Sequence, residues 1–153
     1  MKTRFDFNAV APDAMKAAVA LEMSCQNSGL PKRLIHLIKL RASVINGCSY
    51  CVDMHSKEAQ HSGLSEQWIR LVSAWHESTV FSDEERAVLA FTDSLTLVAQ
   101  TRAPDEDYEA LRQYFSEADI AKIILVIGAI NVWNRIAIGT RKKHPVDAAA
   151  KAA

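Results

Sequence analysis

Apolar residues recur every three to four positions along most of the chain, a spacing that predicts amphipathic helices. No run alternates apolar and polar residues as a half-buried strand would. Proline, glycine and capping residues divide the pattern into helices with the approximate ranges 12–26, 31–45, 48–63, 65–75, 82–98, 104–115 and 116–138. We therefore predict an all-α, single-domain bundle of about six to seven helices.

Local signals mark two of the helix starts with particular clarity. Ser82, with Glu85 three residues later, is the capping-box pattern, in which each side chain bonds the other residue's backbone N–H. Asn46-Gly47 closes the helix that begins near Pro31, because glycine readily adopts the left-handed backbone of a helix end. Cys48 follows directly, so we expect the next helix to begin at or just after Cys48.

The last predicted helix is apolar on almost every side from Ile120 to Val132. A helix without a polar face lies at the centre of a fold or in a subunit interface. Its most apolar run, 123–133, is shorter than the roughly 20 residues that cross a bilayer. We expect a buried helix and a homo-oligomer, and no membrane partner.

The composition is that of an ordinary globular protein of 153 residues, with 49% hydrophobic and 24% charged residues. One domain fits this length; we place it at 1–145, followed by a frayed tail at 146–153. Eighteen basic and eighteen acidic residues cancel, which gives no reason to expect nucleic acid as a partner. Three cysteines without a signal-peptide pattern predict a reducing, cytoplasmic location.

Two of the cysteines and one histidine form a short stripe. Cys51 follows Cys48 by three residues, and His55 follows Cys51 by four. At about 100° per residue, Cys51 and His55 lie about 60° and about 20° from Cys48 around a helix, so all three share one face. In a reducing compartment such a close pair is more often catalytic or metal-binding than a structural crosslink.

This stripe predicts dithiol–disulfide chemistry. The first turn of a helix stabilises a thiolate, and His55 can accept a proton from a neighbouring thiol. The second cysteine can then convert a sulfenic acid or a mixed disulfide into an intramolecular disulfide. The residues alone leave the attacking cysteine open, since the helix start favours Cys48 and the His55 spacing favours Cys51.

Other interpretations of the stripe are a zinc site or two buried cysteines that only fill the core. Zinc would use Cys48, Cys51 and His55, but no fourth ligand is evident in the sequence. A c-type haem would need a histidine directly after the second cysteine, where Val52 stands. We therefore expect no bound metal or cofactor.

A resemblance to a known family runs through 41–55 (RASVINGCSYCVDMH), Trp75, 81–87 (FSDEERA) and 131–135 (NVWNR). Over roughly 30–139 the chain resembles the alkylhydroperoxidase AhpD family, within the carboxymuconolactone decarboxylase-like superfamily. The resemblance implies an all-α fold assembled into dimers, trimers or hexamers. It also implies thiol-dependent reduction of a peroxide substrate, or of a partner's disulfide, with regeneration by an external dithiol reductant, either a protein or a lipoyl group.

The resemblance assigns roles to the stripe: Cys51 attacks the peroxide, Cys48 resolves, and His55 relays protons. Two positions depart from the family pattern. His36 stands twelve residues before Cys48, where the family typically has a glutamate, and Tyr50 stands where peroxidase members have a histidine. His36 is either a replacement member of the relay, because histidine transfers protons near neutral pH, or a core histidine among apolar neighbours.

The sequence leaves two alternative functions open. The first is a non-redox enzyme of the carboxymuconolactone decarboxylase type, in which the cysteines only line a pocket. The second is a metal-stabilised binding oligomer. We also expect Cys25 to be an incidental buried thiol, Glu58 to be a surface residue or to orient His55, and the polar groups Asn131 and Asn134 to make structural hydrogen bonds.

Overall fold

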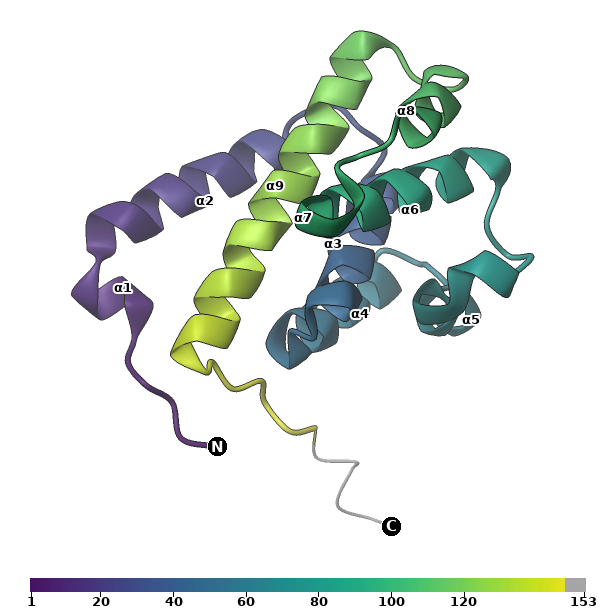
Figure 1. The fold of residues 1–153 in the computed structure, drawn as a ribbon. Helices are drawn as coiled ribbons and strands as arrows, with labels where there is room; N and C mark the ends of the chain where they lie inside the picture. Colours follow the sequence, from purple (N-terminus) through teal and green to yellow (C-terminus); the bar gives the residue numbers. More distant parts are fainter. Residues whose placement is uncertain (148–153) are drawn as a thin grey trace.

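The structure is a computed structural model that describes residues 1–147 (Figure 1). Its helices are α1 (Phe7–Val10), α2 (Pro12–Gln26), α3 (Lys32–Asn46), α4 (Ser49–His61), α5 (Glu66–Leu71), a 3₁₀ helix (Val72–Glu77), α6 (Asp83–Thr96), α7 (Val98–Thr101), α8 (Asp105–Arg112) and α9 (Glu117–Thr140). No strand occurs in this part of the chain, which confirms the all-α prediction. The prediction of a frayed tail concerns residues that lie, from 148 onward, outside the described range.

The observed helices differ from the predicted ones in three places. The single turns α1 and α7 were not predicted, and the predicted helix at 65–75 changes into a 3₁₀ helix at Val72. Arginine side chains explain the change, because they donate hydrogen bonds to the backbone carbonyls of this segment. Arg41 donates to the carbonyls of Val72 and Ser73, each at 3.3 Å, and Arg86 donates to those of Trp75 and His76 at 3.1 and 3.0 Å.

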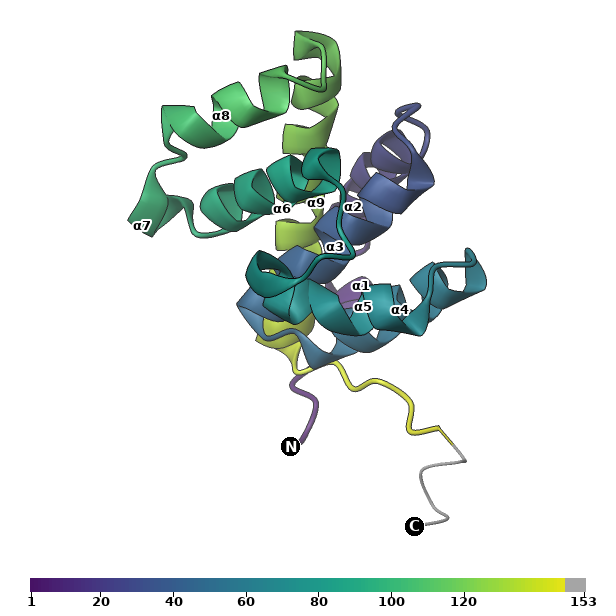
Figure 2. The ribbon, with the colours of Figure 1, turned by 90° about the vertical axis from the view of Figure 1, so that its right-hand side faces the viewer.

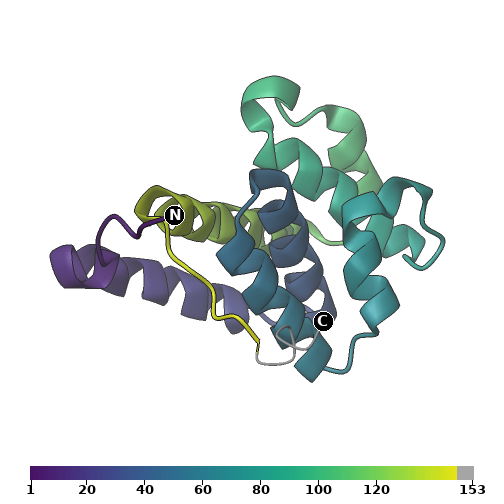
Figure 3. The same ribbon diagram turned by 90° about the horizontal axis from the view of Figure 1, so that it is seen from below.

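Helix α3 is the central element and contacts α6, α9 and α4. Figure 3 shows α2 and α9 on one side of it and α5, α6 and α8 on the other. Figure 2 looks onto the second of these sides, so that α5 and α6 lie in front and α9 lies behind them. The core between α3, α6 and α9 is fully buried and aliphatic, with Leu37, Ile38, Val88, Leu89, Ile127 and Ile130. Burial of such side chains contributes about 1.5–3 kcal/mol each before conformational entropy is subtracted.

Helix α9 has 24 residues and agrees with the predicted helix at 116–138 to within two residues at each end. Its most apolar 18-residue window has a mean hydropathy of 1.6, so by length and composition alone it is long and apolar enough to cross a membrane. In this fold it packs against α2, α3, α4, α6 and α8. It also leaves four large apolar side chains exposed: Ile124, Leu125, Val132 and Ile138.

Charged residues join α3 to α6 near both ends of the contact between the two helices. Arg41 binds Asp93 through two hydrogen bonds, from Nε to Oδ1 at 2.5 Å and from the terminal nitrogen to Oδ2 at 2.7 Å, and the Trp75 indole N–H donates to the same carboxylate at 3.1 Å. Such a planar, two-point contact is the strongest arrangement of an arginine–carboxylate pair.

Glu85 makes the equivalent contact at the other end. It pairs with Arg33, accepts from the Trp68 indole N–H at 3.2 Å, and accepts from the backbone N–H of Ser82 at 3.0 Å. The backbone N–H of Glu85 in turn donates to the Ser82 hydroxyl at 3.2 Å, which confirms the predicted capping box.

Candidate functional site

The turn between α3 and α4 positions the cysteine pair. Gly47 has a φ of 68°, the left-handed conformation that glycine adopts without a side-chain penalty. Its backbone N–H donates to the Val44 carbonyl at 3.1 Å, and that of Cys48 donates to the Ser43 carbonyl at 3.0 Å. These bonds close α3 and start α4 one residue after Cys48, as the sequence predicts.

Asparagines hold this turn onto α9. Asn46 donates through its side-chain amide to the side-chain oxygens of Asn131 and Asn134, at 3.0 and 2.9 Å, and Asn134 donates to the Ser43 hydroxyl at 3.1 Å. The expected structural role of Asn131 and Asn134 is therefore confirmed, and these hydrogen bonds lie within one chain. They fix the end of α3, and hence Cys48, against α9.

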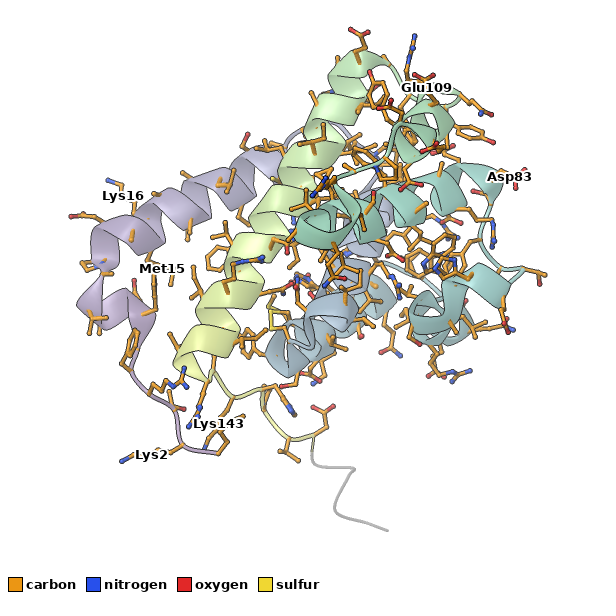
Figure 4. The ribbon with its side chains drawn as sticks, in the orientation of Figure 1. Lys2, Met15, Lys16, Asp83, Glu109 and Lys143 are labelled. Atoms are coloured by element: carbon orange, nitrogen blue, oxygen red, sulfur yellow. A yellow bond between two sulfur atoms is a disulfide. The ribbon has the colours of Figure 1, made fainter. Side chains whose placement is uncertain are left out.

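Cys48 and Cys51 are joined by a disulfide, with their Cα atoms 5.3 Å apart (Figure 4). Each cysteine is only 2% exposed. The Cys48 sulfur also accepts a hydrogen bond from the backbone N–H of Cys51 at 3.3 Å, so it caps α4. The pair that the sequence selects thus lies at the helix start in its oxidised form.

His55 lies one turn further along α4 and is 4% exposed. Its Nδ1 is 2.8 Å from Glu58 Oε2, which favours the Glu58 role of orienting the imidazole. The hydrogen bond with His55 lowers the pKa of Glu58, although burial opposes this. With Nδ1 held by Glu58, the buried Nε2 is the nitrogen that has no hydrogen-bond partner among the described residues.

An ion pair between a buried lysine and a partly buried glutamate, close to His55, was not predicted from the sequence. Lys39, on α3, is 1% exposed and pairs with Glu22 from α2. Burial raises the pKa of Glu22, but hydrogen bonds with Lys39 and Gln26 and the positive charges of Lys39 and His55 outweigh it, so that pKa lies below its ordinary value. A lysine inside the apolar run at 34–40 was the available signal, but its partner depends on how α2 packs.

His36 lies near this group without a hydrogen bond to His55 or to either cysteine within residues 1–147. Its Nε2 is 3.0 Å from the Ser62 hydroxyl, and its buried Nδ1 has no partner among the described residues. Burial lowers the pKa of His36, partly offset by the negative charge of Glu58. His36 therefore borders the site through Glu58, and a part in the proton relay stays a prediction.

Cys25 also borders the Lys39–Glu22 pair. It is a free, fully buried thiol whose pKa is raised by burial and by the charge of Glu22. A thiol that is hard to ionise is a poor nucleophile. Its expected role as an incidental buried cysteine fits these surroundings.

Two hollows reach the disulfide, and we call them the apolar pocket, at Cys51, and the cleft, at Cys48. The larger, of about 490 Å³, touches Cys51 and is walled mainly by apolar side chains, including Phe5, Phe7, Met15, Met54, Trp133 and Ile136. Met15 and Lys143, which both line it, are labelled on α2 and beyond the end of α9 in Figure 4. The smaller, of about 290 Å³, touches Cys48 and contains Arg4, Arg141 and Lys142.

Tyr50, between the cysteines, lines both hollows. Its ring packs with the Cys48–Cys51–Ala137 cluster, and the Lys142 ammonium lies 4.4 Å from the ring centroid. Within the described part of the chain, no three His, Cys, Asp or Glu side chains are placed to hold a metal ion.

The model of the carboxymuconolactone decarboxylase family matches residues 12–94, a range that includes α2, α3, α4 and the cysteine pair. The chain belongs to this family. Within it, the chain is AhpD-like, as the sequence resemblance implies.

A crystal structure of a protein of unknown function from Agrobacterium tumefaciens, proposed to be the antioxidant defence protein AhpD, superposes with a TM-score of 0.94 at 57% identity, covering 95% of this chain and all of that one. YdfG of Bacillus subtilis is 37% identical over 138 residues, which are 90% of this chain and 94% of YdfG. The alkyl hydroperoxide reductase AhpD of Rhodospirillum centenum is 34% identical over 77 residues, 48% of this chain and 41% of that enzyme. The AhpD-like fold of this family member is therefore established.

Proposed function

We propose that this AhpD-like protein is a thiol-dependent alkyl hydroperoxidase in which Cys51 attacks the peroxide. One observation carries the proposal: the cysteine that lies a helical turn before His55 also touches the apolar pocket. An apolar pocket that ends at a reactive sulfur suits the hydrocarbon part of an organic hydroperoxide. The family relationship and the likeness to the AhpD of Rhodospirillum centenum support the same chemistry.

The reaction begins with the reduced pair. The Cys51 thiolate attacks the terminal oxygen of the hydroperoxide, the O–O bond breaks, and the alkoxide leaves as an alcohol after taking a proton. Cys51 is now a sulfenic acid. The Cys48 thiolate attacks the Cys51 sulfur, and the S–S bond forms as hydroxide leaves and is protonated to water. An external dithiol then returns two electrons to the pair.

His55 handles the protons in this scheme. Its Nδ1 is held by Glu58, so Nε2 is free to take the Cys51 proton and to return it to the leaving oxygen. Glu22 adds a second carboxylate that is close enough to the imidazole to interact with it electrostatically. In the family, a glutamate typically stands at the position of His36. We propose that Glu22 and Glu58, the latter beside His36, supply the negative charge that this glutamate would provide.

We propose a cytoplasmic location, where a thiol reductant is available, and a homo-oligomer. The exposed apolar side chains of α9 suit a second copy of the chain, because burying them against another copy removes apolar surface from water. Light scattering on the purified protein would test the assembly; a monomer at every concentration would contradict it.

Peroxide consumption tests the activity. With excess dithiothreitol, we expect the native protein to consume cumene hydroperoxide faster than hydrogen peroxide, since only the former has an apolar part for the pocket. Cys51→Ser should lower the rate at least about 100-fold, as loss of an essential nucleophile does. Equal rates for native protein and Cys51→Ser would contradict the proposal. A non-redox enzyme would instead turn over a cyclic acid and retain that activity in Cys48→Ser.

A further inference from the structure

The two sulfurs of the disulfide face different surroundings. Cys51 lines the apolar pocket and Cys48 does not, whereas Cys48 lines the smaller cleft and Cys51 does not. Tyr50, Ala137 and Lys142 belong to both linings, so they separate the two approaches. A molecule in the cleft therefore meets Cys48 first.

The cleft at Cys48 is basic. Arg4, Arg141 and Lys142 line it, and no aspartate or glutamate does. Arg4 is fixed there, because its backbone N–H donates to the Thr140 carbonyl at 2.9 Å and its guanidinium to the Gly139 carbonyl at 2.8 Å. None of these three cations forms an ion pair within residues 1–147.

Two further lysines add positive charge at the same end of the molecule. Figure 4 shows Lys2 and Lys143 close to the end of α9, where the N-terminal segment meets the residues that follow the helix. The apolar pocket differs in charge, since its lining contains Asp6 besides Lys142 and Lys143. The positive potential is therefore less balanced by acidic groups on the Cys48 side of the disulfide.

The direction of attack in disulfide exchange decides which of the two sulfurs is expelled. An attacking thiolate approaches one sulfur along the S–S axis, from the side opposite the leaving sulfur. From the basic cleft that sulfur is Cys48, and Cys51 is expelled. The leaving sulfur is then the one that precedes His55 by a helical turn, and a stabilised thiolate leaves faster.

We propose that the cleft at Cys48 is the entry for the reductant, and that it selects thiols carried on negatively charged molecules. This inference rests on the proposed function, whose reductant it characterises. The reductant thiolate attacks the Cys48 sulfur, the Cys48–Cys51 bond breaks, and Cys51 leaves as a thiolate. A second thiolate of the reductant then attacks the mixed disulfide, leaving the reductant oxidised and Cys48 reduced, so two electrons enter the protein.

Three small thiols that differ in charge test the inference without any peroxide. The oxidised native protein is mixed with excess 2-mercaptoethanesulfonate, 2-mercaptoethanol or cysteamine, and each rate is divided by the thiolate concentration. We expect the anionic thiol to be fastest and the cationic thiol slowest, with a spread of about tenfold at low salt. The spread should collapse at about 0.5 M salt, where screening acts within a few ångströms.

Charge variants identify the cleft as the cause. Arg141→Asn with Lys142→Gln should abolish most of the spread; asparagine suits the left-handed backbone of Arg141, which has a φ of 56°. Arg70→Gln with Arg112→Gln removes two exposed charges from α5 and α8 and should leave the spread unchanged. Acid quenching and alkylation should find the small thiol on Cys48 and the alkyl group on Cys51.

Equal rates for the three thiols on native protein, or the small thiol on Cys51, would overturn the inference. The salt dependence of native protein decides the matter even if the charge variant does not fold. Failure of the proposed function is a separate result: native protein would then exchange thiols in the expected order, yet consume no hydroperoxide with excess dithiothreitol.

Discussion

Helix α3 has charged side chains in its contact with α6 and in its contacts with α2 and α4. The two regions differ in how completely their polar atoms are hydrogen-bonded. Between α3 and α6, the carboxylates of Asp93 and Glu85 each bind an arginine and a tryptophan N–H. Between α2, α3 and α4, the polar groups are incompletely satisfied. Glu22 Oε2, His36 Nδ1 and His55 Nε2 are buried and have no partner among the described residues.

We interpret this difference as one between polar groups that join helices and polar groups that we propose to act in catalysis. A buried polar atom without a partner costs about 1–3 kcal/mol of stability, so a fold retains few of them. Here three such atoms belong to His55 and to two titratable side chains that interact electrostatically with it, Glu22 and His36. The satisfied region, between α3 and α6, joins these helices, whereas we propose that the unsatisfied region, between α2, α3 and α4, keeps groups available for proton transfer.

The largest expected effect on stability is at the contact between α3 and α6, where the polar groups are satisfied. Asp93→Ala leaves Arg41 and the Trp75 N–H without their partner, and both lie largely inside the protein. We expect a loss of about 3 kcal/mol in the free energy of unfolding, measured by urea titration. Peroxidase activity per folded molecule should be unchanged, because neither group touches the dithiol.

Glu66→Ala is the matched control, since it removes an ion pair with Arg70 in which both side chains are 70% exposed. It should cost less than about 0.5 kcal/mol. A similar loss for the two variants would mean that the Asp93 contact does not hold α3 to α6.

The next largest effect is on activity at the unsatisfied region. His55→Gln keeps a polar side chain but removes the proton carrier, so peroxidase activity should fall about 100-fold. The free energy of unfolding should change far less than in Asp93→Ala, because a glutamine amide can also donate to Glu58 and the Nε2 that is lost makes no hydrogen bond among the described residues. His61→Gln, on the exposed end of the same helix, should retain activity; equal loss in both variants would contradict the assignment.

The smallest effect concerns pH. Burial lowers the pKa of His36 below its ordinary value of 6.5, so the folded protein binds the His36 proton less tightly than the unfolded chain does. The stability that neutral His36 provides is therefore present above about pH 6.5 and lost as the pH falls. Urea titrations at about pH 7.5 and about pH 5.5 should show a steeper loss for native protein than for His36→Gln. Parallel losses would contradict this account of His36.

Local signals made the helix boundaries and the dithiol predictable from the sequence. The capping residues, Asn46-Gly47 and the cysteine spacing all act within a few residues of one another, so no knowledge of packing is needed. The Lys39–Glu22 pair was missed because it joins two helices whose relative position depends on the whole core. The apolar pocket was missed for the same reason, since Arg4 brings the N-terminal segment to the far end of α9.

The short helices and the 3₁₀ segment escaped prediction for a related cause. Asp6 caps α1 with a hydrogen bond from the backbone N–H of Asn8 at 2.9 Å, but a four-residue helix has too few residues to show periodicity. The 3₁₀ geometry after Leu71 follows from arginines that reach it from α3 and α6. Tertiary contacts, not local propensity, decide such segments.

Direct trapping of the oxidised sulfur tests the central assignment, that Cys51 attacks the peroxide. Reduced Cys48→Ser and reduced Cys51→Ser are each treated with one equivalent of cumene hydroperoxide in the presence of dimedone, which captures sulfenic acids, and the labelled peptide is identified by mass spectrometry. We predict a dimedone adduct on Cys51 in Cys48→Ser and little label in Cys51→Ser. Rapid labelling of Cys48 in Cys51→Ser, with none on Cys51 in the other variant, would contradict the assignment.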